Sequence, residues 1–133
     1  MRAVKIITLH CSDSQNPLHD NIDTIRRWHL ERGWKDVGYH FFIRENGTLE
    51  LGRPLEKVPA AVEGFNKNMA AICLHGQNHF SQAQFKTCAR LVKNLMDAFG
   101  VSPENVLPHH HFNPGKTCPN FEVSQVLKYL PDL

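Results

Sequence analysis

The segment from Val106 to Phe121 concentrates the side chains of this 133-residue chain that can do chemistry. It holds three consecutive histidines at 109–111, followed by Lys116 and Cys118. Zinc favours neutral histidine nitrogen and cysteine thiolate, and a hydrolytic zinc keeps three protein ligands and one open position for water. The segment can supply two ligands, so a third must come from elsewhere. The lysine adds a cation that could stabilise developing negative charge. These residues indicate a zinc hydrolase.

His10 is the candidate for the third ligand. Residues 4–10 are rich in β-branched side chains, which predicts a buried central strand with His10 at its carboxyl end. The turn-rich residues 11–17 follow as a loop. In open α/β sheets, ligands bind beyond the carboxyl ends of the strands, so His10 is well placed for chemistry. The alternative is a lone histidine that only caps a strand.

Strands and helices alternate along the rest of the chain. The hydrophobic patterns predict strands at 39–44, 48–52, 69–74 and 106–108, and helices at 22–32, 81–99 and 123–130. Asn46 and Gly47 favour a hairpin with a type I′ turn, and Ser81 with Gln84 forms a capping box. The alternation predicts the α/β class, with a central mixed sheet flanked by helices in a single domain over residues 1–133.

Composition and charge exclude several kinds of protein. The net charge is only +2, so the chain has no strong field that would attract nucleic acid or an anionic membrane. No apolar run approaches the roughly 20 residues that span a bilayer, and the N-terminus lacks the features of a signal peptide. We therefore expect a protein made in the cytoplasm, which would reach a cell wall only after release or export by another system. Four scattered cysteines suggest reduced thiols.

A second signal comes from four stretches taken together, which are residues 9–12, 28–43, 46–53 and 109–121. Their most specific parts are Arg-Gly-Trp-Lys-Asp-Val-Gly-Tyr-His-Phe at 32–41 and Lys-Thr-Cys-Pro at 116–119. In this combination and order the chain resembles the type 2 N-acetylmuramoyl-L-alanine amidase family over nearly its whole length. That family includes zinc amidases of bacteriophages and the peptidoglycan-recognition proteins. The resemblance implies the peptidoglycan-recognition fold.

The resemblance also implies a set of site residues. His10 matches the first ligand of a single zinc ion per chain, His109 the second and Cys118 the third. Tyr39 and Lys116 match the two polar residues that serve the reaction in the phage enzymes. The lysine is also favoured by the residue pattern alone, whereas a tyrosine at the start of a strand more often serves packing.

The second histidine ligand has a neighbouring alternative. His109 stands five residues before Pro114, the family's usual interval, whereas counting back from Cys118 selects His110. A strand that continued through this segment would point adjacent side chains to opposite faces, so the two histidines should not share one role. His111 either orients a ligand or is a solvated loop residue.

The sequence gives weaker evidence of a chemical role for the other histidines. His29 and Trp28 lie in an aromatic stripe at helical spacing and are expected to pack. His40 is expected to be a hydrogen-bonded core residue. His75 ends a predicted strand and is a candidate for facing the cleft.

By resemblance, the function is zinc-dependent hydrolysis of the amide bond between N-acetylmuramic acid and L-alanine. The partner would be peptidoglycan or a muropeptide, with no nucleic acid or membrane insertion, and we expect a monomer. The alternative is a peptidoglycan-binding module of the same fold that does not cut. The enzyme would act as a bacteriolytic phage endolysin, a muropeptide-recycling enzyme or an exported effector, and the first is preferred.

Overall fold

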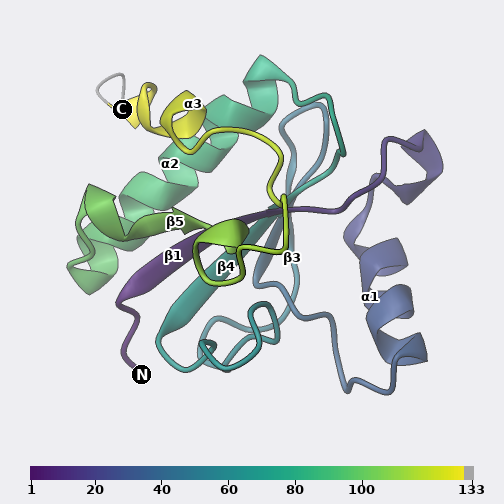
Figure 1. Ribbon diagram of the computed structural model, residues 1–133, viewed down its shortest axis with the longest axis horizontal. Coiled ribbons are helices and arrows are strands. Elements are labelled where there is room, and N and C mark those ends of the chain that lie inside the picture. Colours follow the sequence, from purple (N-terminus) through teal and green to yellow (C-terminus); the bar gives the residue numbers. More distant parts are fainter. Residues whose placement is uncertain (131–133) are drawn as a thin grey trace.

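A mixed five-stranded β-sheet forms the centre of the computed structural model within residues 1–130, the part of the chain that the structure describes (Figure 1). The strand order is β3-β2-β4-β1-β5, and β3 alone runs antiparallel to its neighbour. The strands are β1 Ile6–Cys11, β2 Phe41–Ile43, β3 Leu49–Leu51, β4 Met69–Leu74 and β5 Val106–Pro108. The predicted α/β class and mixed sheet are confirmed.

The central strand β1 pairs in parallel with β4 on one side and with β5 on the other. All six residues of β4 are buried, as are the last five of β1. Parallel strands that are covered on both faces have sequences of consecutive apolar residues, and every residue of Met69–Leu74 is apolar. Because β1, β4 and β5 run in the same direction, their carboxyl ends meet at one edge of the sheet, which includes His10.

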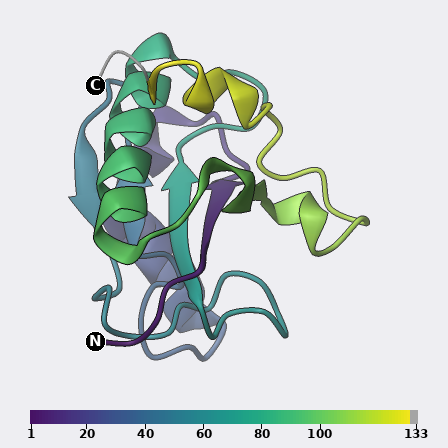
Figure 2. The same ribbon diagram turned by 90° about the vertical axis from the view of Figure 1, so that its left-hand side faces the viewer.

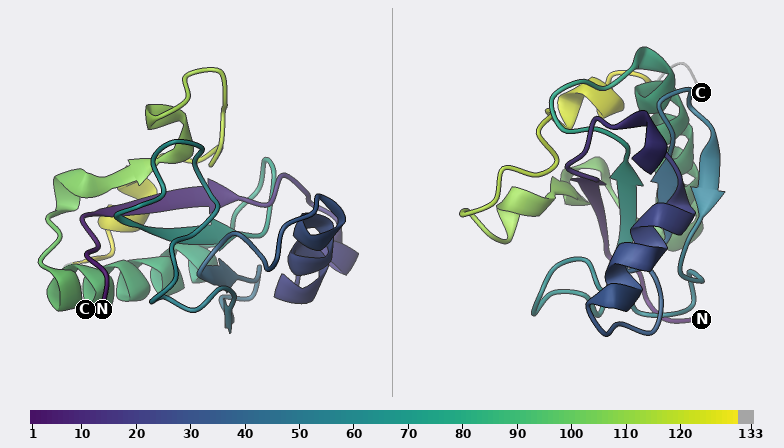
Figure 3. Two further views of the ribbon diagram at one scale, coloured as in Figure 1. Left: turned by 90° about the horizontal axis from the view of Figure 1, so that it is seen from below. Right: turned by 90° about the vertical axis from the view of Figure 1, so that its right-hand side faces the viewer.

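The two faces of the sheet are covered differently. Helix α2 (Gln82–Phe99) and the short helix α3 (Ser124–Leu127) pack on the face that includes Leu9. Helix α1 (Ile22–Glu31) joins a separate cluster on the opposite face, around Phe42 and Cys73. The segment 109–121 lies across the strands from α2 (Figure 2), and α1 stands apart from α2 (Figure 3). Side chains alternate along a strand, so His10 faces away from α2.

Local sequence signals set the ends of the long helices. The Asn21 side chain accepts a hydrogen bond from the Thr24 N–H at the start of α1. The predicted capping box of Ser81 and Gln84 is confirmed at the start of α2, and Gly100 ends that helix with a positive φ of 71°. No helix among the described residues is both long enough and apolar enough to cross a membrane.

Two local predictions are wrong. The hairpin turn is not type I′, because Gly47 alone in it has a positive φ, whereas type I′ needs two such residues. The strand predicted at 39–44 begins only at Phe41, which leaves Tyr39 in the preceding loop. The strand predicted at 106–108 is confirmed as β5, and residues His109–His111 after it form a 3-10 helix. Pro108 pairs with Leu9 at the end of β5 and has no N–H to continue the ladder.

His40 is the core histidine that the sequence predicted. It is 1% exposed, its Nδ1 accepts the Ala71 N–H at 3.1 Å, and its Nε2 lies 2.8 Å from the Lys57 carbonyl oxygen. This pattern requires a neutral ring, with the proton on Nε2 donated to Lys57. Burial accordingly lowers the pKa of His40 to about 4.

We expect the unfolding free energy of the metal-free protein to fall as the pH drops from about 6.5 to about 4. The unfolded chain protonates His40 near pH 6.5 and the folded chain only near pH 4, so acid favours the unfolded state between these values. Each such histidine contributes about 1.4 kcal/mol per pH unit. Urea unfolding at several pH values measures the slope. His40→Asn should be less stable at pH 7 but should show a smaller slope, and an unchanged slope would contradict the assignment.

Candidate metal centre

One ring nitrogen of His10 forms a hydrogen bond, and the other has no hydrogen-bond partner. Its side chain is fully buried, and Nε2 lies 2.9 Å from the Thr8 hydroxyl. That hydroxyl donates to the Ala70 carbonyl oxygen at 3.5 Å, so it accepts the hydrogen on His10 Nε2. His10 Nδ1 is buried without any hydrogen-bond partner. A buried lone pair without a partner is costly unless it binds a proton donor or a metal ion. In histidines that bind a metal, the other ring nitrogen usually donates a hydrogen bond to a neighbouring group, as His10 Nε2 does to Thr8.

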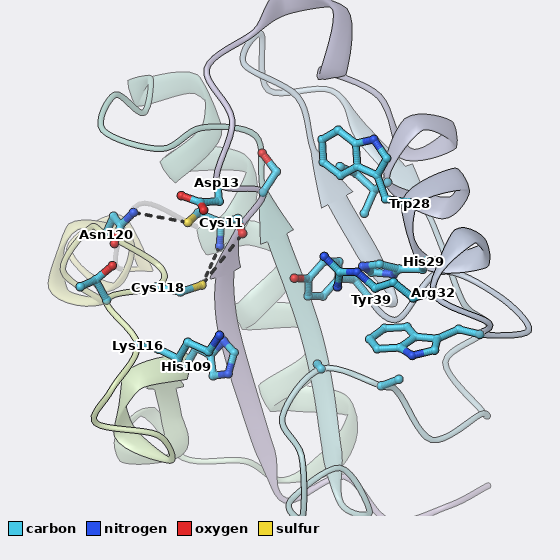
Figure 4. Close-up of a pocket in the computed structure, with 16 residues that line it drawn as sticks. Cys11, Asp13, Trp28, His29, Arg32, Tyr39, His109, Lys116, Cys118 and Asn120 are labelled. Atoms are coloured by element: carbon cyan, nitrogen blue, oxygen red, sulfur yellow. Dashed lines mark hydrogen bonds between the residues drawn. The ribbon is translucent and has the colours of Figure 1, made fainter.

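The structure brings the three predicted ligands together. The ligand atoms of His10, His109 and Cys118 all lie within 4.8 Å of one another. His10 ends β1, His109 opens the 3-10 helix after β5, and Cys118 lies in the loop that follows. The Cys118 sulfur accepts the backbone N–H of Cys11 at 3.1 Å, which anchors that loop to the end of β1. Figure 4 shows His109, Lys116 and Cys118 together on one side of the cleft.

The donor set of two histidines and one cysteine fits zinc. Ligands of one tetrahedral zinc lie about 3.3–3.8 Å apart, so small side-chain movements would close the group around an ion. Burial and the nearby His109 lower the pKa of His10 to about 3, so its ring is neutral as a ligand must be. The Cys118 thiol has a raised pKa, because it is hydrogen-bonded to the Cys11 side chain and because it is buried. A bound cation would offset the cost of deprotonating this thiol, because metals stabilise the thiolate.

Neighbouring histidines lie outside this group. His110 is exposed and lines a different hollow, because the 3-10 turn directs its side chain away from His109. His111 is also exposed and contacts the Phe112 ring. The suggestion that His75 faces the cleft is wrong. It is 1% exposed, and its Nδ1 lies 3.8 Å from a carboxylate oxygen of Asp20.

The metal group borders a cleft of about 300 Å³ between the segment 109–121 and α1 (Figure 4). Lys116 lines it beside the metal group and Arg32 lines it from the end of α1. Lys116 forms no ion pair with any residue that the structure describes. The cleft therefore offers positive charge on both sides, which suits a substrate that carries carboxylates or develops negative charge.

Tyr39 lies across the cleft from Lys116 (Figure 4). Its ring centroid is 5.1 Å from that of His10. Burial raises the pKa of Tyr39 well above its usual value, so the hydroxyl remains protonated and can donate a hydrogen bond. The preceding Gly38 packs against the Ala60 carbonyl so closely that a Cβ would not fit. This close approach places Tyr39 and the loop around Ala60 on the same wall of the cleft.

The wall formed by α1 is the part of the cleft that the sequence did not reveal. Trp28 and His29 were expected to pack, yet both also line the cleft, together with Trp34. His29 Nδ1 accepts the Gly38 N–H at 2.8 Å, and burial lowers the pKa of His29 to about 4. The ring is therefore neutral and carries its proton on Nε2. The specific Arg-Gly-Trp motif at 32–34 was the available signal for this wall.

The sequence profile of a family described as N-acetylmuramoyl-L-alanine amidase matches residues 1–121. The chain belongs to this family. The endolysin of Escherichia phage T7 is 34% identical over 127 residues, which are 90% of this chain and 82% of the relative. The chain is thus an N-acetylmuramoyl-L-alanine amidase, as its sequence resemblance implied.

Solved structures agree with this assignment. The N-acetylmuramoyl-L-alanine amidase LysC from Clostridium intestinale superposes with a TM-score of 0.86 at 25% identity, covering 98% of this amidase and 87% of that chain. Drosophila PGRP-LB superposes with a TM-score of 0.76 at 20% identity, covering 96% and 79%. The second likeness shows that the amidase shares its fold with a peptidoglycan-recognition protein.

Proposed function

We propose that this amidase is a zinc-dependent endolysin that cleaves the bond between N-acetylmuramic acid and L-alanine, with one zinc ion held by His10, His109 and Cys118. The observation that carries the proposal is the convergence of three ligand atoms within 4.8 Å, one of them a buried imidazole nitrogen with no other partner. The match to a phage endolysin supports the lytic setting.

Several residues of the chain have separate roles in amide hydrolysis. When bound, zinc supplies a Lewis acid that polarises the scissile carbonyl and lowers the pKa of water. Lys116 supplies a positive charge at the same edge of the cleft, where it stabilises the carbonyl oxygen as negative charge builds on it. Tyr39 holds a protonated hydroxyl opposite and donates a hydrogen bond to that oxygen or a proton to the leaving amine. His29 presents a neutral N–H donor beside Tyr39.

A direct test combines metal analysis with the appearance of new amino termini. Purified protein is expected to hold one zinc per chain and to release L-alanine amino termini from purified sacculi. Removal of the metal with a chelator should abolish this activity, and stoichiometric zinc should restore it. A folded protein that pulls down sacculi without creating amino termini would identify a binding module instead, and full activity after complete removal of the metal would exclude zinc dependence.

Thr8 gives a second test of the metal site, because its hydroxyl holds the His10 tautomer that leaves Nδ1 free. Thr8→Val keeps the shape of the side chain and removes the acceptor, so we expect zinc affinity to fall by about 10–100-fold. Competition with a fluorescent chelator measures this affinity without reference to activity. Thr8→Ser should restore most of it. Equal affinities for the valine and serine variants would show that the hydroxyl does not orient the ligand.

A further inference from the structure

A second hollow adjoins the cleft across the segment 117–120. Its volume is about 620 Å³, within the range of about 300–1,000 Å³ that is usual for small-molecule sites. Asp13, Thr117 and Asn120 line both the cleft and this hollow, so the two are separated only by a shared wall. That wall lies beside Cys118, so a molecule whose reacting bond sits at the metal group could extend into both hollows.

The second hollow differs from the cleft in its chemistry. Neither lysine nor arginine lines it, whereas the cleft has Lys116 and Arg32. The carboxylates of Asp13 and Glu122 also line the second hollow. Four carboxamide side chains contribute instead, from Gln77, Asn78, Asn120 and Gln125. Amides both donate and accept hydrogen bonds, which suits hydroxyl and acetamido groups better than carboxylates. Because the carboxylates repel anions and accept hydrogen bonds from hydroxyl groups, the hollow favours a neutral, polar ligand over an anionic one.

The backbone that carries these amides is held in place by other residues. The Gln15 side-chain oxygen accepts three successive backbone N–H groups, from Gln77, Asn78 and His79, at 3.0–3.1 Å. The Asn120 side chain donates to the Gln77 carbonyl oxygen at 2.9 Å, which ties this turn to the shared wall. The walls are therefore pre-organised, which lowers the cost of binding.

Several side-chain groups in the hollow are left available for a ligand. The side chains of Gln77, Asn78 and Thr117 make no hydrogen bond with any described residue. Gln125 uses its oxygen to accept the Glu122 N–H, which leaves its NH₂ group unpaired among those residues. A ligand could thus gain hydrogen bonds here without breaking any that the fold needs.

We propose that this second hollow binds the neutral amino-sugar chain of the substrate while the cleft binds the stem peptide. The inference rests on the proposed function, since it assumes that the scissile amide sits at the metal group. That amide joins a neutral glycan to a peptide that carries carboxylates. The glycan matches the amide-lined hollow, where carboxylates and amides can bind its hydroxyl groups, and the peptide matches the cleft with Lys116 and Arg32.

Substrates that share one stem peptide but differ in glycan length test this assignment. We expect kcat/KM to be at least about tenfold higher for a tetrasaccharide peptide than for N-acetylmuramoyl peptide, since each hydrogen bond gained is worth a factor of about 2–10. Asn78→Ala and Gln125→Ala should each shrink this ratio about threefold or more, mainly through KM. Asn94→Ala removes an exposed amide on α2 that lines neither hollow, and it should keep the ratio.

Binding of a tetramer of N-acetylglucosamine gives a readout that is independent of cleavage. In ¹H–¹⁵N spectra, the side-chain NH₂ signals of Asn78 and Gln125 should shift on titration. Shifts confined to the cleft, or no shifts, would overturn the glycan site. If the wild type cleaves both substrates equally, the glycan site is wrong and the proposed function stands. If it cleaves neither, the proposed function is wrong and the titration alone decides whether the hollow binds glycan.

Discussion

Cys118→Ser is expected to lose bound zinc and to lower kcat/KM on sacculi by about 10³-fold or more. Serine replaces a thiolate that zinc prefers with a hydroxyl that stays protonated at neutral pH. A catalytic metal supplies several kcal/mol of transition-state stabilisation, and each 1.36 kcal/mol is a factor of ten in rate. Metal content by elemental analysis and release of L-alanine amino termini measure the two losses.

The loss of zinc expected for Cys118→Ser needs two kinds of control, one for the folding of the variant and one for the choice of ligand residues. Circular dichroism of the metal-free forms should show that Cys118→Ser keeps the wild-type fold. His109→Ala should lose metal in the same way, because its ring lies 4.8 Å from that of His10. His110→Ala and His111→Ala are matched controls that should retain one zinc per chain, since both side chains lie outside the ligand group. Loss of zinc in His110→Ala but not in His109→Ala would reverse the assignment.

Lys116→Met should lower kcat by about 10²–10³-fold while leaving the zinc content at one per chain. Removal of one donor to a developing oxyanion typically has an effect of this size. Methionine retains most of the length of the side chain without its charge. Initial rates at saturating muropeptide, together with metal analysis, separate a catalytic role for the lysine from a role in holding the metal.

The matched control is Lys5→Met, which removes another exposed lysine, one in the N-terminal segment that does not line the cleft. It should leave kcat unchanged. Lys116→Arg should recover part of the activity, because it restores the charge with different geometry. If Tyr39 stabilises the same oxyanion, the combined Lys116→Met and Tyr39→Phe variant should lose less than the product of the two separate losses. Full multiplicativity would instead assign the tyrosine to a different step.

Local signals in the sequence were sufficient for most of the secondary structure. The apolar run of β4, the capping box of α2 and its terminal Gly100 act within a few residues, so each could be recognised without tertiary information. The hairpin turn was placed correctly but given the wrong type, because Asn46 tolerates a positive φ without requiring one. Local chemistry limits the backbone conformations available, and the surrounding strands select among them.

Residue types and their order along the chain were enough to identify the family, the α/β class and the kinds of side chain that could hold a metal. The choice of the histidine that lies next to His10 required the fold. That choice depends on a 3-10 turn after Pro108 and on the contact between Cys11 and Cys118, which are 107 residues apart. The cleft wall at His29 and the second hollow also needed the fold, because contacts between segments distant in the chain leave no local pattern in the sequence.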